Sequence, residues 1–229
     1  MSNLQLMSTE ECPFAQRTMI LMAEKDLTYE YREVDLNNKT DWFEAASPYS
    51  KVPVLIHGDV SVYESSIVNE YLNETFPEPP MMPDSPAERA QARIWIDYDN
   101  VKFVPAFYKV LLAKDEGRRQ ELADTLIESL RFMESQALAK RKGGPYWLGN
   151  SCSLVDIALY PHFERLVVLE FYRGISMPDE CGALREWLAA MAERPCVKRS
   201  AHDAEYHIKA YTRYADGSAN GTTAKDMRN

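Results

Sequence analysis

The sequence predicts an α/β domain followed by an all-α domain. Up to about residue 76, short stretches of alternating apolar residues, typical of strands, are separated by helical patterns. Five prolines then occur in FPEPPMMPDSP, between Phe76 and Ala87, and proline continues neither a helix nor a central strand. Beyond Ala87 the apolar pattern is helical almost throughout. We therefore expect a first domain at 1–77, a linker at 78–86, a helical domain at 87–215 and a disordered tail at 216–229 that lacks apolar anchors.

The first domain begins with a strand and a helix. Leu4 to Leu6 alternates as a strand, and a polar turn follows. Pro13 then opens a mostly buried helix that ends near Glu24. Proline suits the first helical position because the N–H that it lacks would have no partner there. A second strand is predicted within 27–36 and a short helical piece within 37–46.

The domain ends with a hairpin and a helix. Strands at 52–56 and 61–63 meet at a turn around Gly58, and Ser65 is expected to cap a helix that runs to about Phe76. The complete order is βαβαββα, which is thioredoxin-like. In the helical domain we expect helices at 87–113, kinked at Pro105, and at 118–141, 154–172 and 183–193, with shorter pieces after Pro195.

Composition excludes several classes of function. The chain of 229 residues has a net charge of −9, which repels phosphate backbones, so nucleic acid is not an expected partner. No apolar run approaches the ~20 residues of a membrane helix, and the N-terminus does not resemble a secretory signal. We expect a cytoplasmic protein. The four cysteines (Cys12, Cys152, Cys181 and Cys196) show neither CxxC spacing nor a Cys/His cluster, so we expect reduced thiols and no metal site.

Cys12 is the candidate for chemistry because it directly precedes the helix that Pro13 opens. The N–H groups and dipole at a helix N-terminus favour the thiolate and lower the pKa of a cysteine from its usual ~8.5. Arg17 is a possible additional positive charge. Ala15 occupies the position at which a dithiol oxidoreductase carries its second cysteine, so this thiol exchanges only with an external thiol. The alternative is that Cys12 is a small buried apolar residue, as we expect for the other three cysteines.

Several motifs together resemble a cytosolic glutathione transferase. They are ECPFAQR, NNKTDWF, SKVPVL, YESSIVNEYL, the proline-rich linker and SLVDIALYP, in that order. The CPF form is most similar to the cysteine-type omega and lambda branches. The resemblance implies that glutathione is the co-substrate and that Cys12 forms a mixed disulfide with it. It also implies a homodimer, in which the first domain of one subunit contacts the helical half of the other.

The resemblance also implies a set of glutathione-binding residues. Phe14 borders the tripeptide, and Lys39 reaches its glycine carboxylate. Val52-Pro53 corresponds to a segment with a cis-proline, whose preceding backbone pairs with the cysteinyl part of the ligand. The pair Glu64 and Ser65 holds the γ-glutamyl end.

Three further features are a departure from the family pattern, a helix cap and a set of aromatic residues. Ser50-Lys51 stands where many members have a glycine before the Val-Pro step, which makes Lys51 a second candidate cation. Ser151 or Ser153 with Asp156 resembles the capping box of a buried helix, a structural feature. Aromatic residues of the first long helix are at helical spacing, which is more typical of a core than of a substrate pocket, and we assign none to a site.

The sequence leaves three functions open. The first is a glutathione-dependent thiol transferase or reductase that acts through Cys12. The second is conjugation of glutathione to an electrophile, with Ser8 or Thr9 as the hydroxyl donor. The third is a non-catalytic protein of the stringent-starvation type, which has this fold and contacts RNA polymerase. The expected small-molecule partners are therefore glutathione and an electrophilic or oxidised substrate.

Overall fold

The N-terminal half of the computed structural model, which describes residues 3–36 and 38–228, is built on a four-stranded sheet. Its strands are β1 (Leu4–Ser8), β2 (Glu30–Glu33), β3 (Val54–His57) and β4 (Val60–Tyr63). Their order is β2-β1-β3-β4, with β1 parallel to β2 and antiparallel to β3, and β3 antiparallel to β4. The predicted βαβαββα order is confirmed.

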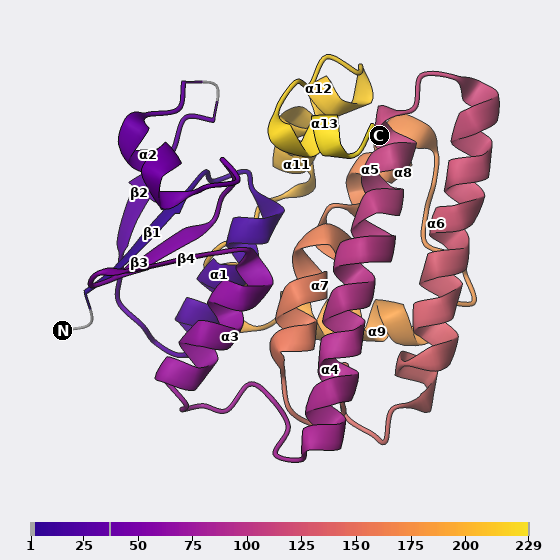
Figure 1. Ribbon diagram of the computed structural model, residues 1–229. Helices are drawn as coiled ribbons and strands as arrows, with labels where there is room; N and C mark the ends of the chain where they lie inside the picture. The colour runs from indigo at the N-terminus through magenta and orange to yellow at the C-terminus, as the bar shows by residue number, and fades with distance from the viewer. Residues whose placement is uncertain (1–2, 37, 229) are drawn as a thin grey trace.

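Helices cover both faces of the sheet (Figure 1). Successive side chains of a strand point to opposite faces. Leu6 and Leu55 accordingly pack into the main core, to which α1 (Pro13–Glu24) and α3 (Ser65–Thr75) contribute. Their neighbours Met7 and Val54 pack against α2 (Asp41–Ala46) in a smaller cluster. The helix α1 lies between the sheet and the C-terminal half, where it contacts α7 (Leu154–Glu164).

The C-terminal half is helical, as predicted, but two long helices are divided. The first is α4 (Pro86–Tyr98), a π-helical turn (Asp99–Phe103) and α5 (Val104–Leu112), because Pro105 cannot donate an N–H to the preceding turn. The second divides at Arg165 into α7 and α8 (Leu166–Arg173). The remaining elements are α6 (Glu116–Gln136), a 3₁₀ turn (Leu138–Lys140), α9 (Gly182–Ala192), α10 (Pro195–Lys198), α11 (Ala204–Ala210), α12 (Thr212–Ala215) and α13 (Thr222–Asp226).

The tail beyond residue 215 differs from the prediction of disorder. It folds back over the molecule, and its helix α13 lies in Figure 1 between the sheet half and α5. Ala219 and Ala224 are buried, and the Ala219 N–H donates to the carbonyl of Arg213 over 2.7 Å. The side chain of Arg228 donates to the Ala219 carbonyl over 2.6 Å. The anchors are methyl groups and backbone hydrogen bonds, which an apolar pattern in the sequence does not reveal.

Candidate functional site

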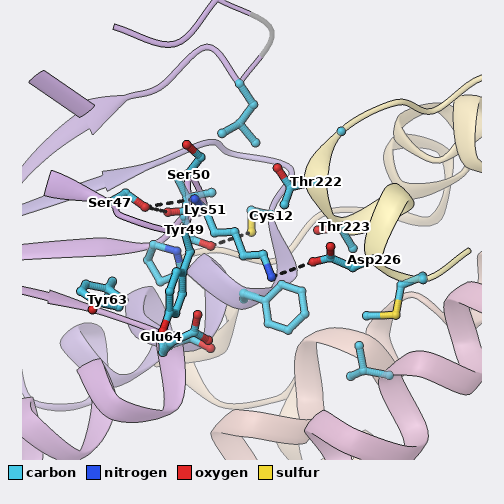
Figure 2. Close-up of a pocket in the computed structure, with 18 of the residues that line it drawn as sticks. Cys12, Ser47, Tyr49, Ser50, Lys51, Tyr63, Glu64, Thr222, Thr223 and Asp226 are labelled. Carbon is cyan, nitrogen blue, oxygen red and sulfur yellow. Dashed lines mark hydrogen bonds and ion pairs between the residues drawn. The ribbon is translucent and has the colours of Figure 1, made fainter. Parts of the chain in front are cut away.

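A cavity of about 280 Å³ opens between the two halves of the chain (Figure 2). Its walls come from the start of α1, the loop that precedes β3, the start of α3, the junction of α4 and α5, α12 and the segment that contains α13. All seven residues predicted for the site line this cavity: Cys12, Phe14, Lys39, Val52, Pro53, Glu64 and Ser65. The fold thus brings together positions that are spread over about fifty residues of sequence.

Cys12 occupies the N-cap position of α1 and is partly buried. Pro13 follows as the first helical residue, and the Gln16 N–H donates to the Cys12 carbonyl over 3.0 Å to begin the helix. The Cys12 thiol donates to the Val52 carbonyl, with 3.8 Å between Sγ and the oxygen. The peptide bond between Val52 and Pro53 is cis, as the resemblance implies.

The pKa of Cys12 departs from the prediction. Burial raises the pKa of this thiol above its ordinary value, although the N–H groups of Phe14 and Ala15 and the charges of Arg165 and Arg17 act in the opposite direction. The helix N-terminus therefore contributes as expected, but desolvation of the anion is larger. The sequence did not predict this outcome because burial of the sulfur depends on packing against residues that are distant along the chain, such as Val52.

We expect the rate of Cys12 alkylation in the ligand-free protein to increase with pH. Its apparent pKa is expected to lie above that of free cysteine, which is ~8.5. The thiolate is the reactive form, and a raised pKa keeps the thiol protonated at neutral pH, so reactivity appears only as pH rises. Iodoacetamide labelling followed by peptide mass spectrometry measures this profile, with free cysteine as the control. A midpoint below that of free cysteine would contradict the burial argument.

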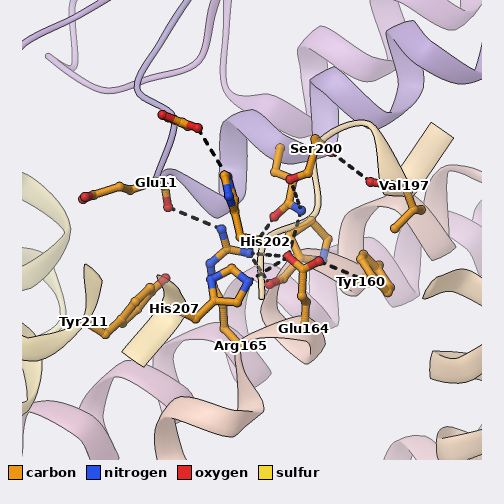
Figure 3. A network of polar contacts seen from close by, with 12 residues as sticks. Glu11, Tyr160, Glu164, Arg165, Val197, Ser200, His202, His207 and Tyr211 are labelled. Carbon is orange, nitrogen blue, oxygen red and sulfur yellow. Dashed lines mark hydrogen bonds and ion pairs between the residues drawn. The ribbon is translucent and has the colours of Figure 1, made fainter. Parts of the chain in front are cut away.

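A buried polar network holds the turn that carries Cys12 (Figure 3). Arg165, which is 1% exposed, donates from Nη1 to Gln16 Oε1 over 2.6 Å and from Nη2 to the Glu11 carbonyl over 3.4 Å. Glu164 accepts from the Gln16 amide over 2.8 Å and lies 3.2 Å from the His207 ring. Since Glu11 precedes Cys12 and Gln16 follows it by one helical turn, α7, α8 and α11 together fix the start of α1.

Arg17 performs the same role at the start of α3. Its guanidinium is buried, pairs with Asp99 and donates to Ser65 Oγ over 3.2 Å and to Asn100 Oδ1 over 2.8 Å. Asn100 in turn donates to Ser66 Oγ over 3.0 Å. The side chain therefore does not face solvent, and it ties the Ser65 hydroxyl to the second domain. Ser65 was predicted to cap α3, but Glu64 is the N-cap and Ser65 is the first helical residue.

Two residues of the cavity have backbone angles that side chains rarely adopt. Glu64 has a φ of 68° and Ser50 a φ of 53°, and both line the cavity. Such angles cost about 1–3 kcal/mol in non-glycine residues and cluster at functional sites. The Ser50 angle lies in the left-handed region that glycine adopts most readily, and here a serine forms the turn.

The two cations of the cavity have local partners. The Lys39 ammonium donates to the Ser50 carbonyl over 3.2 Å, and the Lys51 ammonium pairs with Asp226 over 2.8 Å. Glu64 also lines the cavity, and Figure 2 shows it near Tyr63, on the side away from Asp226. The site thus offers two cations and two carboxylates around the Cys12 sulfur.

Several cavity residues were missed by sequence reasoning. One wall is formed by Tyr214 of α12 and, beyond it in the chain, by Thr222, Thr223, Asp226 and Met227. No signal in the sequence indicated them, because most lie in the stretch that composition assigned to disorder.

The predicted hydroxyl donors have a different environment. Ser8 is fully buried and donates to the Thr9 carbonyl over 3.1 Å, and neither residue lines the cavity. The aromatic residues Phe103, Phe107 and Tyr108 are buried in the core, as their helical spacing favoured.

The rest of the described chain adds two observations. Within residues 3–36 and 38–228, no group of three or more His, Cys, Asp or Glu side chains is arranged to hold a metal ion. In the same residues, no helix combines the length and apolar character required to cross a membrane.

Comparison with known proteins identifies relatives of both halves. Residues 6–80 match the family model "Glutathione S-transferase, N-terminal domain", and residues 116–190 match "Glutathione S-transferase, C-terminal domain". The chain is 36% identical over 194 residues to glutathione S-transferase U24 of Arabidopsis thaliana, covering 84% of this chain and 86% of that protein. It is 32% identical over 195 residues to glutathione S-transferase omega-1 of Sus scrofa, covering 85% and 78%. The structure of rice GST1 in complex with glutathione superposes with a TM-score of 0.86 at 28% identity, covering 96% and 99%.

Proposed function

The chain belongs to the glutathione S-transferase family, and from this premise we propose that it is a glutathione-dependent thiol transferase in which Cys12 forms a mixed disulfide with glutathione. The observation that carries this proposal is the position of Cys12, partly buried at the N-cap of α1 and facing a cavity lined by both cations and carboxylates. A relative crystallised with glutathione supports the choice of co-substrate.

The charges of the cavity suit glutathione, which has two carboxylates and one ammonium. Lys39 and Lys51 are available to its glycine carboxylate, and Glu64 to its ammonium. Ser65, at the first turn of α3, offers a hydroxyl and an N–H to the γ-glutamyl carboxylate. The backbone of Val52 beside cis-Pro53 pairs with the cysteinyl part, and Phe14 borders the tripeptide.

Ligand binding also provides a way to ionise the thiol. In the free protein the Cys12 S–H donates to the Val52 carbonyl, which favours the protonated form. A ligand N–H that takes this carbonyl removes the acceptor, and the helix N–H groups with Arg165 and Arg17 then favour the thiolate. We therefore propose that glutathione binding lowers the pKa that burial raises.

The reaction is thiol–disulfide exchange. The Cys12 thiolate attacks the glutathione sulfur of a glutathionylated substrate, the substrate disulfide breaks, and the substrate thiolate leaves and takes a proton. The thiolate of a second glutathione attacks the Cys12–glutathione disulfide, which releases oxidised glutathione and restores the Cys12 thiolate. Ala15 is buried where a second cysteine would resolve the disulfide internally, so the second glutathione is required.

Mass spectrometry after treatment with oxidised glutathione tests this proposal. We expect one glutathionyl group on Cys12 and none on Cys152, Cys181 or Cys196, which are buried. Cys12→Ala is expected to remain unmodified under the same conditions. An unmodified Cys12, or an adduct only at another cysteine, would overturn the proposal.

The alternatives have less support. A conjugating enzyme that uses Ser8 or Thr9 would need a hydroxyl in the cavity, and neither residue lines it. A non-catalytic protein would not require Cys12, Lys39 and Glu64 to meet around one cavity. Calorimetry with glutathione distinguishes the non-catalytic protein from the thiol transferase, since a non-catalytic protein is expected not to bind glutathione.

We also propose that the protein is a cytoplasmic homodimer. Ile67 of α3 and Ile94 of α4 are 58% and 56% exposed, and both belong to adjoining parts of the two halves. Exposed apolar side chains of this size are more favourable in an interface than in water. Size-exclusion chromatography with light scattering measures the oligomeric state, and a monomeric mass would contradict the dimer.

A further inference from the structure

The C-terminal segment 221–227 places a carboxylate inside the candidate glutathione site. Asp226, at the end of α13, lines the cavity and pairs with the Lys51 ammonium over 2.8 Å (Figure 2). Lys51 directly precedes the Val52-Pro53 step, and its neighbour Ser50 accepts a hydrogen bond from Lys39. Asp226 therefore lies at the cationic end of the cavity, where the proposed function puts the glycine carboxylate of glutathione.

The charge balance of the cavity makes this contact significant. Its charged lining residues are Lys39, Lys51, Glu64 and Asp226, two of each sign. Glu64 faces the ligand ammonium in the proposed binding mode, so only Asp226 faces a ligand carboxylate of the same charge. The two carboxylates repel each other at short distance, and each would pair with the Lys51 ammonium. When glutathione enters the cavity, Lys51 is therefore already paired with Asp226.

The C-terminal segment is also weakly anchored. Ala224 is its only fully buried side chain among the described residues 221–228, and the segment contributes glycine and threonines to the cavity wall. The Lys51–Asp226 pair is 43% and 49% exposed, and exposed ion pairs contribute little. A ligand can therefore displace Asp226 without disrupting the core.

We infer that Asp226 is an affinity-determining residue that competes with the glycine carboxylate of glutathione for Lys51, so that ligand binding displaces the segment 221–227. This inference rests on the proposed function, because it assumes that glutathione occupies the cavity. In the free protein, the Asp226 carboxylate occupies the place at Lys51 that the ligand carboxylate takes in the complex.

Calorimetry with two ligands tests the competition in the full-length protein. The ligands are glutathione and its glycyl ethyl ester, which lacks the competing carboxylate. Asp226→Asn is expected to bind glutathione about two- to fivefold more tightly than wild type, the range of one exposed ion pair, with the ester unchanged. Asp216→Asn is the matched control, since Asp216 lies shortly before this segment and outside the cavity. The gain is expected to shrink at high salt.

Two further variants and one measurement separate the outcomes. In Lys51→Gln, adding Asp226→Asn is expected to give no gain, because the contested cation is gone. Hydrogen exchange of residues 221–227 is expected to become faster in wild type when glutathione binds, whereas in Asp226→Asn it is expected to be fast already without the ligand. If glutathione binds but Asp226→Asn leaves or weakens its affinity, this inference is wrong and the proposed function stands. If neither protein binds glutathione, both are overturned.

Discussion

Cys12→Ser is expected to lose glutathione-dependent disulfide and dehydroascorbate-type reduction by on the order of 10³-fold or more. A serine hydroxyl stays protonated at neutral pH and cannot form a disulfide with glutathione. The surrounding cavity is expected to remain, because Cys12 is only partly buried and contributes one weak hydrogen bond. Steady-state rates with a glutathionylated peptide measure the loss.

The matched control for this prediction is Cys152→Ala. Cys152 is a buried thiol outside the cavity, so its removal is expected to leave the rate per folded molecule unchanged. The same Cys12→Ser protein is informative with a chlorodinitrobenzene-type electrophile. A gain of conjugation there supports thiol exchange as the activity of the parent, since the cysteine no longer competes as the nucleophile. Full reductase activity in Cys12→Ser would refute the role of this thiol.

Asp156→Ala is expected to lower the free energy of unfolding by about 4 kcal/mol, which corresponds to roughly 10 °C in the melting temperature. Asp156 is fully buried at the start of α7. It accepts from the Trp147 N–H over 2.7 Å, the Trp187 indole N–H over 2.8 Å and the Ser153 N–H over 2.8 Å. Alanine leaves these three donors buried without an acceptor.

Two variants provide the comparison for Asp156. Asp115→Ala removes the exposed N-cap of α6, where Asp115 accepts from the Arg118 N–H, and is expected to cost about 1 kcal/mol. Asp156→Asn keeps one acceptor oxygen and is expected to lie between the two. Urea denaturation followed by circular dichroism measures all three. Equal losses for Asp156→Ala and Asp115→Ala would show that burial of the network adds nothing.

The capping box illustrates how far local sequence reasoning reaches. The sequence offered Ser151 or Ser153 with Asp156, and the structure has Ser153, whose backbone and hydroxyl both donate to Asp156. The resemblance implied this box with either serine, and the structure selects Ser153, which stands three residues before Asp156 as a capping box requires. The two tryptophan donors come from other elements, so they were not predictable.

The cavity shows the same division between local and distant determinants. The motifs that carry the resemblance supplied the seven predicted lining residues, all in the first half. Other residues of that half also line the cavity and were not predicted, among them Leu36, Ser47, Tyr49, Tyr63 and Ser66. The wall from Tyr214 to Met227 was missed because small side chains and backbone hydrogen bonds hold it.

The sequence by itself determined the order of strands and helices, the placement of Cys12 at the start of α1 and the absence of a second thiol at Ala15. These follow from short-range geometry, because proline, helix periodicity and strand alternation act within a few residues. Only the tertiary structure decided the pKa of Cys12 and the partner of Lys51. Both depend on which distant segments exclude water from the cavity and bring charge into it, and those contacts form only when the chain folds.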